Sequence, residues 1–130
     1  MKGVSMRFNQ IAFLVAIMCA LCGCTSSHLS QSQAQVAVDE ALKQVKANGN
    51  LSLEADAHVL GVTEGNDNTA IADINFSNAT YSCGWSMPPE QWGNGKAGFK
   101  KYNDKGWVLT ELSSGQILCS GVFPVNIPVH

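Results

Sequence analysis

The side chain with the clearest potential for acid–base chemistry is His58, which has Asp56 two residues before it and Asp73 on a neighbouring predicted strand. Either carboxylate could orient the imidazole as a dyad. The chain has three histidines but no HExxH or GxSxG motif and no second histidine at ligand spacing. A single strand histidine is usually structural, so we expect no catalytic residue, no metal site, no cofactor and no enzymatic activity.

Cys83 and Cys119 are the next reactive side chains, and both follow an amino-terminal export signal. Two cysteines, an even number, in a chain that is exported to an oxidising compartment predict a disulfide. Such a bond would close a loop of about 36 residues and stabilise the fold by about 3–4 kcal/mol in the chain-entropy model. Two free thiols or a metal pair are the alternatives, although the chain has no CxxC motif and no histidine near either cysteine.

Trp85 and Trp92 lie in segment 84–95, which contains a proline pair and three glycines. Aromatic side chains on an irregular loop can bind sugar rings, a peptide or a partner protein. The alternative is that one or both fold back and cap the sheet beside Cys83. The sequence leaves both interpretations open, and it makes Trp85 and Trp92 the candidate binding residues.

The amino terminus has the layout of an export signal. Residues 1–10 are basic, residues 11–22 are apolar, and Gly23 precedes Cys24. The apolar run is shorter than the roughly 20 residues that a membrane-spanning helix needs. An ordinary cleaved signal or an uncleaved anchor would share this layout.

The segment Leu21-Cys22-Gly23-Cys24 resembles the lipobox of bacterial lipoproteins. The resemblance implies that residues 1–23 are a signal peptide and that Cys24 becomes the first mature residue, acylated on its sulfur and on its new amino group. Thr25, in a place where the family can carry Asp, implies the outer membrane. The domain would then lie in the periplasm or at the cell surface, with the membrane as its first partner.

The charge balance of the mature chain excludes one class of partner. Lys2 and Arg7 leave with the signal, so the remainder keeps six of the eight basic residues and all ten acidic ones, a net charge of −4. Nucleic-acid binding needs a basic face to neutralise phosphates. We therefore expect no nucleic-acid partner.

The mature chain divides into a tether, a helix and strands. Residues 24–33 are small and polar and predict a flexible, lipidated tether, and helical spacing of Val38, Leu42 and Val45 predicts a helix over 32–47. Alternation predicts strands at 57–63, 69–77 and 80–83, and a hairpin pairing 97–102 with 107–112. The Asn- and Gly-rich segment 65–68 predicts a turn; it has part of a calcium loop's composition but lacks the closing glutamate. Segment 116–123 is apolar, and the prolines in 124–130 exclude a central strand.

These elements predict one α+β domain over 34–130, with an amino-terminal helix on an antiparallel sheet of about four to five strands and one disulfide. Segments 98–102 and 106–109 within it resemble the aromatic hairpin of small cystatin-like and NTF2-like folds. Members of those groups include enzymes, inhibitors and interaction domains, so the resemblance leaves function open.

Two functions of different classes follow. The first is a non-enzymatic binding or assembly module that contacts another envelope protein through segment 84–95 or an exposed strand edge. The alternative is an envelope receptor for a small ligand or glycan, held in a pocket between helix and sheet with Trp85 or Trp92 at its mouth.

Overall fold

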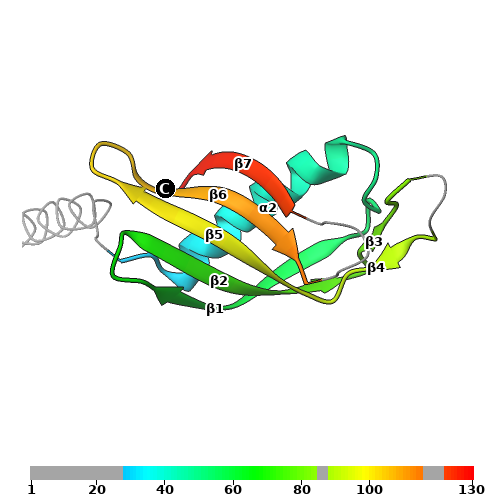
Figure 1. The fold of residues 1–130 in the computed structure, drawn as a ribbon, viewed down its shortest axis with the longest axis horizontal. Coiled ribbons are helices and arrows are strands. Elements are labelled where there is room, and N and C mark those ends of the chain that lie inside the picture. Colours follow the sequence, from blue (N-terminus) through cyan, green and yellow to red (C-terminus); the bar gives the residue numbers. More distant parts are fainter. Residues whose placement is uncertain (1–27, 85–87, 116–121) are drawn as a thin grey trace, which may run out of the picture.

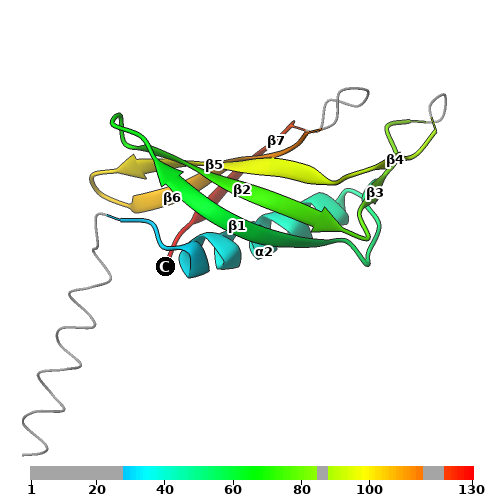
Figure 2. The same cartoon turned by 90° about the horizontal axis from the view of Figure 1, so that it is seen from below.

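The computed structural model describes residues 28–84, 88–115 and 122–130. Helix α2 (Gln31–Ala47) packs against one face of a five-stranded sheet, as Figures 1 and 2 show from two directions. This arrangement confirms the α+β class and the predicted antiparallel sheet. The sheet strands are β1 (Asp56–Glu64), β2 (Thr69–Ser77), β5 (Asn94–Tyr102), β6 (Gly106–Ser114) and β7 (Val122–Pro128).

The strands follow one another across the sheet in the order β1-β2-β5-β6-β7, and every neighbouring pair is antiparallel. Between β2 and β5 the chain forms a separate two-stranded sheet from β3 (Thr80–Tyr81) and β4 (Glu90–Gln91). This small sheet lies at the end of the molecule opposite the β1–β2 and β5–β6 turns (Figure 1). The pairing of β4 was not predicted, because two residues beside a proline pair carry no alternating pattern.

Helix α2 begins at a capping box. The Ser30 hydroxyl accepts a hydrogen bond from the Gln33 backbone N–H, and the Gln33 side chain accepts one from the Ser30 N–H. Leu29 is already buried, and His28 Nδ1 lies 2.9 Å from Glu64 Oε2. The folded domain therefore begins by residue 28. The predicted tether boundary at residue 33 is wrong, because a capping box placed before the apolar repeat extends the helix towards the amino terminus.

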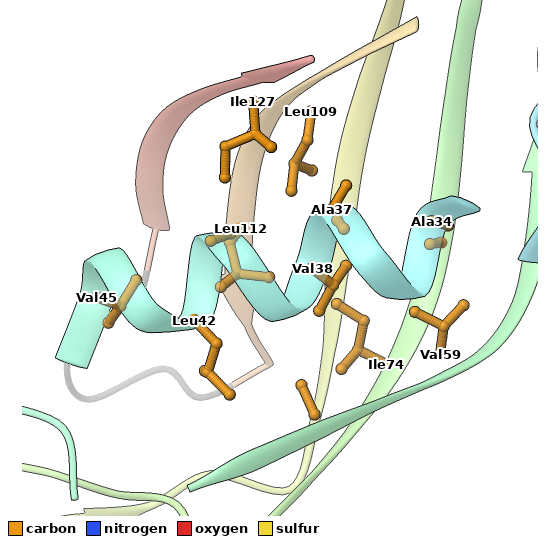
Figure 3. Close-up of a cluster of buried hydrophobic side chains, with 14 of the residues drawn as sticks. Ala34, Ala37, Val38, Leu42, Val45, Val59, Ile74, Leu109, Leu112 and Ile127 are labelled. Atoms are coloured by element: carbon orange, nitrogen blue, oxygen red, sulfur yellow. The ribbon is translucent and has the colours of Figure 1, made fainter. Parts of the chain in front are cut away.

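The hydrophobic core lies between α2 and the sheet. Figure 3 shows side chains of α2 facing those of β1, β2, β6 and β7. The helix contributes several alanines, which let it approach the sheet closely, and the predicted valine and leucine stripe. The buried residues of the helix are Ala34, Ala37, Val38, Ala41, Leu42 and Val45.

Strand β2 follows the predicted alternation along its whole length. Its inward residues are almost completely buried, whereas Asp73 and Asn75 point to the opposite face. The inward set is Ala70, Ala72, Ile74 and Phe76.

Strand β1 departs from simple alternation. Val59 pairs with Ile74 but Gly61 pairs with Asp73, so Leu60 is an extra residue in a β-bulge. The bulge leaves Leu60 55% exposed and turns Val62 back towards the core, on the same side as Val59. Simple alternation along 57–63, which would place Leu60 and Val62 on the same face, is therefore wrong for this strand. Gly61 is the sequence signal, because an isolated glycine in a strand often marks a bulge.

Candidate functional site on the open face of the sheet

Trp92 lies inside the fold and is only 2% exposed. It immediately follows β4, and its backbone N–H donates to the Ala79 carbonyl at 2.8 Å. Its ring stacks on Tyr81 at 5.0 Å between centroids and meets Phe76 edge-on at 5.2 Å and Phe123 at 5.6 Å. The binding role considered for Trp92 is therefore wrong, and the alternative, a cap at the end of the core, describes its position.

The remaining predicted site residues are described only in part. Trp85, Cys24 and Cys119 lie outside the described residues, so a binding role for Trp85 and lipidation of Cys24 stay predictions. Cys83 is half-buried just after β3. Its pairing with Cys119 stays a prediction as well.

The dyad considered for His58 is not assembled. His58 is exposed on β1, and its cross-strand neighbour is Asn75. The Asp73 carboxylate is ion-paired with Lys96 at 2.9 Å, and the Asp56 carboxylate accepts a hydrogen bond from the Ala57 backbone N–H at 3.0 Å. Both carboxylates therefore contact other groups and not the His58 imidazole.

The segment considered for calcium forms the β1–β2 turn. The Thr69 hydroxyl donates a hydrogen bond to the Asp67 carboxylate, and this bond lowers the pKa of Asp67. Asn68 adopts the left-handed conformation with φ of 61°. Within residues 28–84, 88–115 and 122–130, no three His, Cys, Asp or Glu side chains gather closely enough to hold a metal ion.

The outer edge of β1 is covered by side chains from α2. The Gln35 amide donates to the Ala57 carbonyl at 2.8 Å and accepts from the Val59 N–H at 2.7 Å, as a neighbouring strand would. Gln31 donates to the Val59 carbonyl at 2.8 Å. Unpaired backbone groups at a sheet edge can pair with another strand, and these two glutamines occupy three of them, at Ala57 and Val59.

The opposite edge of the sheet is β7, which contains Pro124 and Pro128. Proline has no N–H to donate, so it weakens an edge as a template for a further strand. The Val129 N–H is directed inward, to the Trp107 carbonyl at 3.0 Å. Part of each edge is thus protected, which argues against a strand-edge contact at the Ala57–Val59 part of β1 and at the prolines of β7.

The sheet face opposite α2, here called the open face, is covered by no helix or strand of the described ranges (Figure 2). One row of cross-strand neighbours runs over all five strands on this face. Asp73 and Lys96 form their ion pair at the middle of the row. The row consists of Gly61, Asp73, Lys96, Ser113 and Val122.

The open face contains a hollow of about 540 Å³ along this row. Gly61 contributes no side chain to the hollow, and a Cβ built at this position would meet no atom within 4 Å. Three apolar side chains are exposed on the open face: Leu60 by 55%, which lines the hollow, and Ile71 by 47% and Val122 by 51%, which lie outside its lining. Residues that line the hollow include Leu60, Gly61, Asp73, Asn94, Lys96 and Ser113.

The space between helix and sheet, where the sequence placed a ligand pocket, is filled by the core side chains. The sequence reasoning missed the open face as a site because its polar residues fit an ordinary solvated face. The alternation of β2 did place Asp73 and Asn75 on it. The exposure of Leu60 depends on the bulge, which alternation alone does not reveal.

Comparison with protein-family models, curated proteins and solved structures finds no match to this chain. The resemblances to bacterial lipoproteins and to cystatin-like and NTF2-like folds therefore stay predictions. None of the described helices is long and apolar enough to cross a membrane.

Proposed function

We propose that the chain is a lipid-anchored cell-envelope lipoprotein of the outer membrane and that it acts as a non-enzymatic binding or assembly module. The open face is the contact surface for an envelope protein. The observation that carries this proposal is the exposure of Leu60, Ile71 and Val122 around a polar row on an uncovered sheet face. Protein interfaces combine apolar side chains with hydrogen-bonding and charged groups beside them.

The composition of the open face suits a protein better than a small molecule. The Asp73–Lys96 pair supplies one charge of each sign, and Asn94 and Ser113 supply hydrogen-bonding groups beside it. These groups are spread along a row rather than gathered in an enclosed site. A folded partner with complementary charges could cover the whole row and the apolar residues next to it.

The test is photo-crosslinking in living cells from a reactive amino acid at Ile71. The matched control carries the same group at Val36, which is 64% exposed on the helix side of the domain. We expect a discrete protein adduct from position 71 and none from position 36. An adduct from position 36 alone would transfer the contact to the helix and reject the open face.

A receptor for a small ligand or glycan is the second candidate. The observation that favours it is the hollow of about 540 Å³, which lies in the size range of small-molecule sites. Gly61→Trp would place a large side chain in the hollow, where a Cβ at position 61 would meet no atom within 4 Å. A receptor would show a fluorescence change on adding cell-wall fragments, the change would disappear in Gly61→Trp, and position 71 would give no protein adduct.

The anchor and the disulfide have one test in common, the intact mass of protein extracted from membranes. Lipidation at Cys24 removes residues 1–23 and adds acyl chains, and a Cys83–Cys119 bond removes two hydrogens. Support for the disulfide comes from the cysteines that remain: once residues 1–23 are removed and Cys24 carries lipid, Cys83 and Cys119 are left to pair. A mass equal to the full chain would reject the anchor.

A further inference from the structure

We propose that the end of the domain nearest Cys24 rests on anionic phospholipid headgroups through a basic tip on the β5–β6 hairpin. The basic tip consists of Lys100, Lys101, Tyr102, Lys105 and Trp107. This inference depends on the lipid anchor proposed above, and it adds a second contact between the domain and the bilayer.

The basic tip and the start of the domain lie at the same end of the molecule (Figures 1 and 2). The Lys101 N–H donates to the Asn68 carbonyl at 2.8 Å, which joins the two hairpin ends. A small pocket of about 290 Å³ is lined by His28, Glu64, Lys101 and Trp107, so the first described residue borders the tip.

The chain length between lipid and domain is short. Four peptide units connect Cys24 to His28, and even a fully extended chain spans only about 14 Å over that distance. An acyl group on Cys24 would therefore hold the basic tip close to the bilayer surface. The β3–β4 end is farther away by about the length of β5, nine residues or roughly 30 Å.

Positive charge is concentrated at this end. Three of the six lysines in residues 24–130 belong to the basic tip. The Lys100 and Lys105 ammonium groups each lie 5.6 Å from the Tyr102 ring centroid, and Tyr102 is 37% exposed. Lys101 lies 5.9 Å from the Trp107 ring centroid.

Two carboxylates of the β1–β2 hairpin also lie at this end, and their contacts leave their negative charge in place; residues 100–107 themselves carry three lysines and one aspartate, a net charge of +2. Glu64 contacts His28, and Asp67 accepts the Thr69 hydroxyl. Asp104 is exposed in the β5–β6 turn and offsets one lysine.

The chemistry of the basic tip fits an anionic bilayer surface. Lysines attract anionic headgroups when they lie within a Debye length of them, and tyrosine is favoured where an apolar surface meets water. With its net charge of −4 the mature chain would otherwise be repelled from such a surface. An acidic protein partner is the competing occupant of the tip, and the experiment separates the two.

The experiment uses the lipoprotein extracted from membranes and reconstituted into vesicles of phosphatidylcholine with phosphatidylglycerol. A photo-crosslinking amino acid replaces Asn103 in the turn of the tip, or Leu53, which is 79% exposed and lies at the far end. We expect phospholipid adducts from position 103 and none from position 53. Equal lipid adducts from the two positions would overturn the proposal, as would adducts only with protein when position 103 is tested in cells.

The charge requirement is tested by removing lysines from the tip and, as a control, from the helix. Lys100→Gln, Lys101→Gln and Lys105→Gln together should lower the lipid adduct yield by up to about fivefold for each lysine. Lys43→Gln with Lys46→Gln removes charge from α2 and should leave the yield unchanged. The proposal would be overturned by a tip variant that unfolds in urea like the wild type and still gives the wild-type yield of lipid adducts.

Flotation with vesicles of pure phosphatidylcholine separates this proposal from the anchor on which it depends. Flotation with these vesicles, combined with no lipid adducts at position 103 on the vesicles that contain phosphatidylglycerol, would reject the basic tip and leave the anchor standing. Absence of flotation would reject the anchor at Cys24 itself.

Discussion

A hydrogen bond from His28 lowers the pKa of the Glu64 carboxyl below its ordinary value of 4.5, with help from the Leu29 N–H. The contact fastens the first described residue to the end of β1. Because the folded pKa lies below the unfolded one, ionised Glu64 contributes stability that is present above the ordinary value. That contribution is lost as the pH falls through the folded pKa.

The prediction is that Glu64→Gln is less stable than the wild type at neutral pH and that the difference disappears in acid. The measurement is urea unfolding of both proteins over a range from neutral to acidic pH. Glu54→Gln, an exposed carboxylate outside this contact, serves as the control. A difference that stays constant over the whole range would show that the charge of Glu64 does not stabilise the fold.

Trp92 gives a second prediction at the residue scale. Trp92→Ala would leave a large cavity among Phe76, Tyr81 and Phe123, so the free energy of unfolding should fall by about 3–5 kcal/mol. Trp92→Phe should cost less, because the indole nitrogen has no hydrogen-bond partner among the described residues. Tyr102→Ala on the exposed tip should change stability by less than about 0.5 kcal/mol. Similar losses from Trp92→Ala and Tyr102→Ala would contradict the buried cap.

At the scale of single elements, β5 contains two glycines with different surroundings. A Cβ on Gly95 would lie 2.5 Å from the Phe76 ring and closer still to the Ser113 carbonyl, whereas a Cβ on Gly98 would meet Glu111 Cβ at 3.6 Å. Gly95→Ala should therefore destabilise the fold by about 1–3 kcal/mol through overpacking. Gly98→Ala should be neutral or stabilising by up to about 1 kcal/mol. Chemical denaturation of the pair tests this, and equal effects would contradict it.

The edge of β1 depends on one helix side chain. Gln35→Leu removes both hydrogen bonds to Ala57 and Val59, which should cost about 1–3 kcal/mol and expose the edge to other strands. Gln44→Leu makes the same change at an exposed position of the same helix. We expect light scattering to detect self-association of Gln35→Leu alone. A monomeric Gln35→Leu of wild-type stability would refute the edge cap.

The elements were predictable where the pattern was local. Helical spacing identified α2, and alternation identified β2 to the residue, because both depend on side chains a few positions apart. The bulge at Leu60, the strand β4 and the amide contacts of Gln35 depend on neighbours distant in sequence. The open face belongs to this second kind, because it exists only once five strands lie side by side.

At the scale of the whole molecule, the predicted Cys83–Cys119 disulfide would connect the β3 end to the segment before β7. Cys83→Ser with Cys119→Ser should lower the free energy of unfolding by about 3–4 kcal/mol in the chain-entropy model. Urea unfolding of the double variant, with and without reductant, tests the prediction. The control is the wild type in reductant, which should match the double variant. A double variant as stable as the oxidised wild type would reject the bond.

The contacts of Gln31 and Gln35 with the edge of β1 matter most where many copies of the protein lie close together. Anchored copies would stand at one height with one orientation and diffuse only within a plane, which raises their effective concentration towards one another. The two sheet edges differ, so pairing β1 of one copy with β7 of the next would be head-to-tail and would continue as an open row. Two amides from α2 and two prolines in β7 prevent that row from starting. Pairing through the sheet edges would then not join anchored copies, even at high surface density.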